Sequence, residues 1–307
     1  DSSRVAIIGV LLPILLGYLA STILLEDAEL HTRLFLGATL AATSVGITAM
    51  VLQEMKMGQT EIAHIILGAA VFDDVLGLLM LAIISGIVVN GSVDLVNISL
   101  TIIKATVFLL VMVYIGSYFV RKFIKLFHRL DIIEAKMFVS YLFVMVVAWM
   151  ANLSGLATII GAFAAGLILN DSYFKHWDTK EGKCPITIKD LIMPLEVILV
   201  PIFFVLMGLQ VKLETFLQPG VMKLTIGLLI AAIVGKVASG YGAFGVKNKF
   251  AIGFGMMPRG EVGLVFAAIG KSLGVMDDAL FSAVVLMVVV TTLLSPPLFK
   301  SCLRRCK

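Results

Sequence analysis

Charged side chains are scarce in this sequence: they make up 14% of its 307 residues, whereas hydrophobic residues make up 60%. Soluble globular domains carry roughly 25% charged residues, so this composition excludes an ordinary soluble domain. The mean hydropathy of +1.07 indicates a membrane protein. A net charge of +4 does not indicate a nucleic-acid partner, because most basic residues stand in short gaps between apolar runs.

Cysteine is also rare. The three cysteines, Cys184, Cys302 and Cys306, do not form a metal-ligand pattern, and the last two stand in a basic tail without a nearby histidine. We therefore expect no resident metal or cofactor. The first apolar run follows Arg4, as in a signal peptide, but it is too long and lacks a clear cleavage site, so it is predicted to be a membrane span.

Long apolar runs are abundant. A hydrocarbon core of about 30 Å needs about 20 apolar residues in one helix. Ten predicted spans lie at 5–25, 34–52, 62–89, 98–120, 138–150, 154–169, 191–209, 224–244, 250–269 and 280–299. The fifth and sixth are short and separated by the turn Asn152–Gly155, which also permits a tilted or partly re-entrant hairpin. The expected fold is an all-α membrane protein, a multi-spanning helical bundle.

Basic residues sort to one side of these ten spans. Seventeen lie in gaps on one side, which includes the C-terminus, and the other side has Arg33, Lys212, Lys223 and Lys271. The positive-inside rule predicts that the first side, with the C-terminus, is cytoplasmic.

Two spans contain helix-breaking residues near mid-membrane. The second is interrupted at Thr43–Thr48 and the ninth at Met257–Gly263. Helix breaks at that depth are typical of spans whose ends face an aqueous cavity. The two spans are seven apart and must cross in opposite directions, which indicates an inverted-topology repeat relating spans 1–3 to spans 8–10.

Asp73 and Asp74 stand about twelve residues into the third span, where a rise of about 1.5 Å per residue puts them near the bilayer centre. A charged residue there costs about 2.5–3.5 kcal/mol. Adjacent buried carboxylates that accept either a proton or a cation provide a way to couple the two ligands. A hydrogen-bonded structural role, or a misplaced span, is the alternative interpretation.

Three more charged residues lie inside predicted spans. Lys236 is near the middle of the eighth, and we expect it to pair with Asp73 or Asp74; a static structural pair or an extended, snorkelling side chain is the alternative. Arg259 and Glu261 flank the second break, and we expect a structural role, with the broken-helix ends as partners.

Hydroxyl groups of Thr43 and Ser44 at the first break offer the oxygen ligands that small hard cations prefer. Three segments of the sequence resemble the second cation:proton antiporter family, in its Na⁺/H⁺ branch. They are Ala41–Thr48, which contains the first break, Ala70–Gly77, and Met257–Gly263. Lys236 agrees with the pattern, and the resemblance covers nearly the whole chain.

The resemblance implies a function and a division of work. Asp74 would carry the ion and the proton, Asp73 would pair with Lys236, and Thr43 or Ser44 would surround Na⁺ or Li⁺ at the aspartates. It implies elevator-type exchange of two protons per sodium without enzymatic activity. Relatives with a Gln–Asp pair favour potassium, which Asp73 argues against, although K⁺/H⁺ exchange stays the alternative.

The resemblance also implies an organisation. Residues 1–90 and 211–307 would form the core transport domain with the broken helices 34–52 and 250–269, residues 91–136 a linker helix, and residues 137–210 a scaffold for a homodimer. The membrane would be a prokaryotic inner membrane. Family members usually have further helices before the first span, so we expect the chain to lack N-terminal helices.

Two other classes of membrane protein fit the sequence less well. An intramembrane aspartyl protease needs two aspartates facing each other from different helices, whereas neighbours on one helix point about 100° apart. A passive cation channel conflicts with the central Lys236, which would repel the conducted ion.

Overall fold

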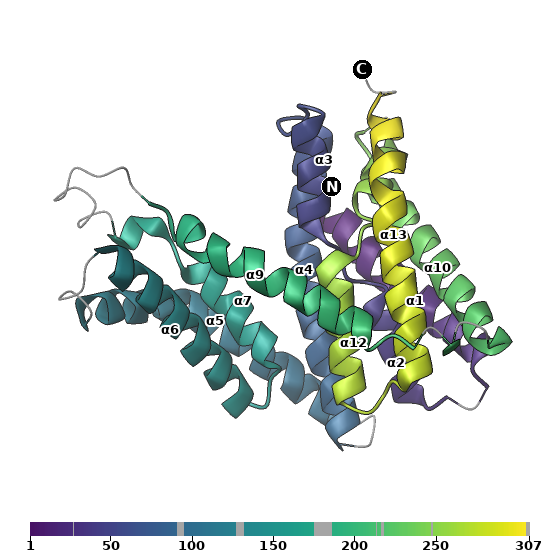
Figure 1. Cartoon of the computed structure of the whole chain (residues 1–307), viewed down its shortest axis with the longest axis horizontal. Coiled ribbons are helices and arrows are strands. Elements are labelled where there is room, and N and C mark those ends of the chain that lie inside the picture. Colours follow the sequence, from purple (N-terminus) through teal and green to yellow (C-terminus); the bar gives the residue numbers. More distant parts are fainter. Residues whose placement is uncertain are drawn as a thin grey trace. The chain divides into compact units, whose positions relative to one another are not determined.

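A computed structural model describes residues 1–26, 28–90, 95–126, 132–174, 186–212, 214–215, 218–246 and 248–304. Cys184, Cys306 and part of the basic side lie outside the described residues: Arg129, Lys175, Lys180, Lys183, Lys247, Arg305 and Lys307. Helices and turns form the described part of the chain, without strands (Figure 1). The helices are α1 (Ser2–Leu24), α2 (Leu30–Thr39), α3 (Val45–Glu54), α4 (Glu61–Asn90), α5 (Leu95–Leu126), α6 (Ile132–Leu153), α7 (Thr158–Ile168), η1 (Asp171–Phe174), α9 (Ile188–Leu209), α10 (Pro219–Ser239), η3 (Gly240–Gly242), α11 (Lys249–Gly255), α12 (Gly260–Ser272) and α13 (Asp278–Arg304).

Each predicted span coincides with one helix or with a pair of helices. Within the described ranges, seven helices are long and apolar enough to cross a membrane: α1, α4, α5, α6, α9, α10 and α13. The pair α11–α12 is one further candidate, bent by 50° at its break. The predicted span 34–52 is the broken pair α2–α3, and 154–169 is α7, whose 11 residues extend roughly 16 Å. The expectation of an all-α, multi-spanning bundle is therefore confirmed.

The chain divides into two compact units. Unit 1 comprises Asp1–Gly91 and Leu206–Lys307, and unit 2 comprises Ser92–Val205. In unit 1, α1 packs against α2, α4 and α10, and α13 packs against α10, α11 and α12. In unit 2, α5, α6 and α7 pack against one another.

The contact between α1 and α10 is very close because a glycine lies at the crossing. A Cβ at Gly235 would lie 2.9 Å from the Cα of Pro13 on α1, so a larger residue would push the helices apart. The side chain of the next residue, Lys236, passes Gly9 of α1: a Cβ there would lie 3.7 Å from its Nζ atom. Small residues on both helices thus make room for a lysine inside the bundle.

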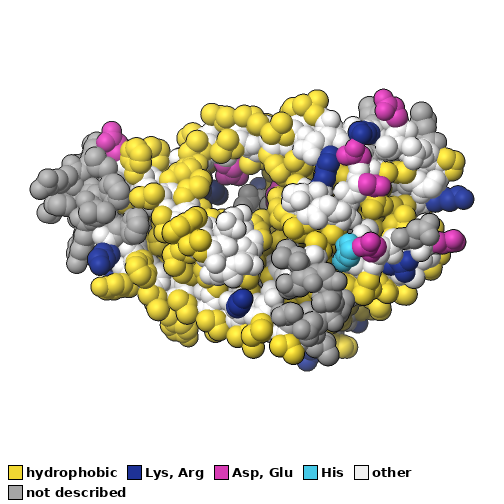
Figure 2. Space-filling view, turned by 90° about the horizontal axis from the view of Figure 1, so that it is seen from below, with side chains coloured by type: hydrophobic (Ala, Val, Ile, Leu, Met, Phe, Trp, Pro, Cys, Tyr) yellow, Lys and Arg dark blue, Asp and Glu magenta, His cyan; other side chains and the backbone are white. Residues whose placement is uncertain are grey.

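The outer surface of the described residues is apolar. Hydrophobic side chains cover most of the surface visible in Figure 2, and charged side chains are few and scattered. Large residues with more than half of their surface exposed include Leu11, Tyr114, Val197 and Leu293. In water such a surface would drive aggregation, whereas in lipid it matches the solvent. The chain is an integral membrane protein.

Candidate functional site

The two helix breaks contact each other in unit 1. Between the end of α2 and Ser44 the chain is not helical. The backbone N–H of Ser44 donates to the Pro258 carbonyl oxygen at 2.7 Å. Pro258 lies in the second break, between α11 and α12, where it has no N–H to continue a helix. In Figure 1, α2 lies at the bottom and α3 at the top, whereas α12 ends at the bottom, where α13 begins. The broken helices therefore run in opposite directions, as expected.

Hydroxyl groups of the first broken helix bind the open end of α11. Thr43 Oγ1 donates to the Met256 carbonyl oxygen at 3.2 Å, and Thr48 Oγ1 donates to the Gly255 carbonyl oxygen at 2.6 Å. Carbonyl groups at the C-terminal end of a helix have no partner within that helix. Thr48 was expected within the break but lies inside α3, because the break ends at Ser44.

Arg259 plays the corresponding part for α2. Its side chain is fully buried, and its guanidinium donates to the carbonyl oxygens of Leu40, of Met257 at 3.2 Å and of Ala232 at 3.3 Å. A cation at a helix C-terminus is stabilised by the helix dipole. Among the described residues Arg259 makes no ion pair with Glu261.

Glu261 instead binds the first break. The hydroxyl of Ser44, which is fully buried, lies 3.0 Å from Oε1 and 2.9 Å from Oε2 of Glu261. Between Arg259 and Glu261, Gly260 has a φ of +33°, and a Cβ on it would lie 2.8 Å from the Ser44 hydroxyl oxygen. Gly260 thus allows the two breaks to meet. Its N–H donates to the Thr292 hydroxyl on α13 at 3.0 Å.

Asp73 and Lys236 form a buried ion pair between α4 and α10. Both side chains are fully buried, and Lys236 Nζ lies 3.0 Å from Oδ2 and 3.2 Å from Oδ1 of Asp73. The argument from burial left open which aspartate Lys236 would meet, whereas the family resemblance implied Asp73, which is its partner in the structure.

Asp74 has different surroundings. Asp74 is half-buried, and its side chain makes no hydrogen bond or ion pair with another described residue. Of the two adjacent aspartates, Asp73 is therefore paired with a lysine, whereas the carboxylate of Asp74 is unpaired among the described residues. Of the seven residues singled out from the sequence, Lys236 pairs with Asp73, the side chain of Asp74 has no partner among the described residues, and the other four bind at the two breaks: Thr43, Ser44, Arg259 and Glu261.

Some polar contacts of this region could not be found from the sequence. Thr292 stands in an apolar run, where a threonine commonly bonds its own helix, so its contact with Gly260 has no sequence signal. The carbonyl oxygens of Leu40 and Ala232 belong to the backbone, and only a structure shows that Arg259 reaches them.

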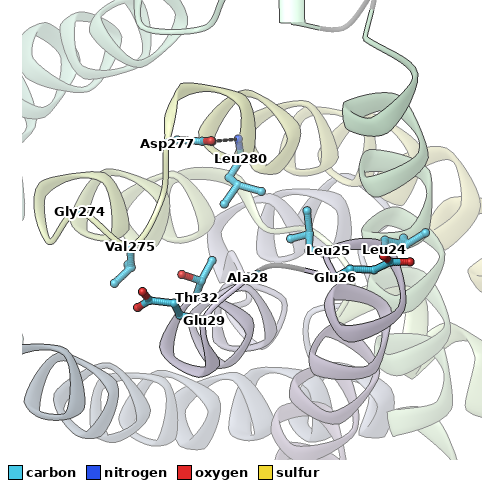
Figure 3. A pocket seen from close by; sticks show the side chains of 10 residues that line it. All are labelled: Leu24, Leu25, Glu26, Ala28, Glu29, Thr32, Gly274, Val275, Asp277 and Leu280. Atoms are coloured by element: carbon cyan, nitrogen blue, oxygen red, sulfur yellow. Dashed lines mark hydrogen bonds between the residues drawn. The ribbon is translucent and has the colours of Figure 1, made fainter. Parts of the chain in front are cut away.

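A hollow of about 520 Å³ lies at one end of unit 1, between the α1–α2 and α12–α13 connections (Figure 3). The carboxylates of Glu26, Glu29 and Asp277 stand among its lining residues, which do not include the aspartate pair. Beside it, Lys212 Nζ lies 2.6 Å from Asp278, and this hydrogen bond raises the pKa of Lys212. An acidic rim attracts cations from solution.

Comparisons with known proteins assign the chain to a family. A family model described as "Sodium/hydrogen exchanger, transmembrane" matches residues 2–302. The chain is 38% identical over 305 residues to the "High-affinity Na(+)/H(+) antiporter NhaS3" of Synechocystis sp., covering 97% of this chain and 64% of that relative. It is 32% identical to the "Na(+)/H(+)-K(+) antiporter GerN" of Bacillus cereus, covering 98% of this chain and 75% of that relative.

A solved structure has a similar fold. It is that of the sodium proton antiporter MjNhaP1 from Methanocaldococcus jannaschii at pH 8, with a TM-score of 0.65 and 18% identity, covering 98% of this chain and 76% of that one. The resemblance drawn from the three sequence elements is confirmed: the chain belongs to the sodium/hydrogen exchanger family.

Proposed function

We propose that this chain is the ion-carrying part of a secondary active antiporter that exchanges Na⁺ or Li⁺ for H⁺. The observation that carries the proposal is the contrast between the two aspartates. Lys236 closes Asp73, whereas Asp74 is half-exposed and has no partner in the described part of the chain. The names of the relatives in Synechocystis and Bacillus support cation/proton exchange.

In this mechanism Asp74 binds either the cation or a proton, so the two ligands exclude each other. Asp73 is the second carboxylate, and it can join the cation site when the lysine ammonium gives way. Thr43 and Ser44 stand at the first break and would supply oxygen ligands. Two protons for each sodium would make the exchange electrogenic.

We assign transport to unit 1; the proposed linker helix, residues 91–136, and the proposed homodimer scaffold, residues 137–210, fall largely in unit 2. Unit 1 contains both broken helices and the aspartate pair. Elevator-type alternating access would move unit 1 through the membrane. We place the protein in a prokaryotic inner membrane with a cytoplasmic C-terminus, on the strength of the basic-residue asymmetry.

The test is reconstitution into liposomes that contain a pH-sensitive dye. Outward H⁺ movement driven by added Na⁺ or Li⁺ is expected, and Asp74→Asn should abolish it. Exchange at the wild-type rate by Asp74→Asn would refute the central role of this residue. No cation-driven pH change in the intact protein would refute antiport.

Exchange of K⁺ for H⁺ is the second candidate, supported by the name of the Bacillus relative, which includes potassium. The same liposomes distinguish it when KCl replaces NaCl. A cation channel, the remaining alternative, could not move protons against their gradient at the expense of a sodium gradient.

A further inference from the structure

The contact between Ser44 and Glu261 joins the two breaks, and the Ser44 hydroxyl has only one hydrogen to donate to the two carboxylate oxygens of Glu261. Ser44 is fully buried, and its hydroxyl faces both carboxylate oxygens of Glu261, at 3.0 and 2.9 Å. An ionised carboxylate only accepts hydrogen bonds, whereas a serine hydroxyl has one hydrogen to donate and two lone pairs. The hydroxyl hydrogen of Ser44 therefore points at Glu261.

This orientation decides what Ser44 can offer to an ion. With its hydrogen donated to Glu261, the serine oxygen keeps its lone pairs for another partner, and the described residues supply no donor to it. A hydroxyl oxygen turned in this way is a ligand for a small hard cation.

We propose that Glu261 is a positioning residue for the transported cation: it accepts the hydrogen bond of the Ser44 hydroxyl, so that the serine oxygen becomes a cation ligand at the first break. This inference rests on the proposed antiport function and deepens it, because it extends the cation site from the first broken helix and the aspartates to α12. The sequence had suggested a purely structural role for Glu261.

The alternative is that the contact merely ties α3 to α12. The variant Glu261→Gln separates the two ideas, because the glutamine amide has nearly the same shape but can donate a hydrogen to the serine oxygen. That donation would occupy a lone pair, and the negative charge would be lost. A structural tie would survive the change, whereas a cation ligand would not.

The experiment measures Na⁺-driven H⁺ exchange in proteoliposomes over a range of Na⁺ concentrations for the wild type, Glu261→Gln, Ser44→Ala and the double variant. We expect Glu261→Gln to raise the KM for Na⁺ about tenfold, with a smaller fall in the maximal rate. The double variant should be no worse than Ser44→Ala, since both changes remove one interaction. Glu54→Gln is the matched control: Glu54 is an exposed carboxylate at the other end of α3, paired with Lys300 at 2.6 Å.

An unchanged KM in Glu261→Gln would overturn the proposal, as would effects of the two single variants that multiply in the double variant. If Glu261→Gln is too unstable to reconstitute, the Na⁺-dependent rise of the melting temperature in detergent replaces the transport measurement. Na⁺ should then stabilise the wild type and Glu261→Asp at lower concentrations than Glu261→Gln, and equal Na⁺ dependence would refute the idea. Absence of exchange in the wild type would instead refute the proposed function.

Discussion

The buried ion pair between Asp73 and Lys236 provides a direct test of the physical reasoning. Both side chains are fully buried, and two contacts of 3.0 and 3.2 Å join them. Lys236→Met keeps the length and the apolar stem of the side chain but removes the ammonium. It therefore leaves the Asp73 carboxylate inside the bundle without its partner.

The expected loss follows from the burial of both groups. Removing one partner of a buried pair typically destabilises a protein by about 3–5 kcal/mol, because the remaining charge is uncompensated. For a domain of roughly 200 residues this corresponds to a fall in melting temperature of roughly 6–20 °C. Replacing both partners, in Asp73→Asn with Lys236→Met, should recover at least half of the loss, since no unpaired charge remains.

The assay is thermal unfolding of the purified protein in detergent, followed by intrinsic fluorescence. Lys212→Met serves as the matched control, because Lys212 and Asp278 form an exposed pair, with 57% and 37% of their side chains accessible. Exposed pairs contribute little to stability, so this variant should melt close to the wild type. A single variant Lys236→Met that melts with the wild type, or a double variant no more stable than it, would contradict the reasoning.

Two further predictions concern the helix breaks. Gly260→Ala should destabilise the protein by about 1–3 kcal/mol, because φ is +33° and the new Cβ would lie 2.8 Å from the Ser44 hydroxyl oxygen. The control Gly46→Ala should be neutral or stabilising, because its Cβ would meet nothing within 4 Å. Equal melting temperatures for the two variants would refute this prediction. Arg259→Gln should cost at least about 2 kcal/mol of stability, because the carbonyl oxygen of Leu40 and the other carbonyl oxygens that Arg259 binds lose their donor. Arg259→Lys should not restore stability, since an ammonium lacks the planar fork of donors. Full recovery with lysine would show that charge alone matters.

Much of the architecture could be predicted because lipid imposes strict rules on a sequence. A spanning helix must be long and apolar, so the run at 5–25 identified α1 and the run at 280–299 identified α13. The same rule made Asp73 and Lys236 conspicuous. Each costs free energy when it is buried alone, so each needed a partner.

The details of the breaks could not be predicted, because distant contacts determine them. The first break spans Leu40 to Ser44 instead of Thr43 to Thr48, since α3 starts directly after the residue that binds Pro258. That contact joins positions far apart in the chain, and local composition does not encode it. The partners of Arg259 are backbone carbonyl groups, which every residue has.

The charges around the helix crossing favour one cation at a time in the proposed ion site. Three carboxylates, on Asp73, Asp74 and Glu261, accompany two cationic groups, on Lys236 and Arg259, so one negative charge remains. One monovalent cation neutralises it, whereas two protons leave one positive charge, so the proposed exchange of two protons for one sodium moves net charge. A neutral site costs least to move past apolar surroundings, because the solvation penalty of a net charge falls away. A site that is neutral with a bound cation and charged without a ligand favours movement of the loaded carrier over the empty one, which is the property that the proposed antiport needs.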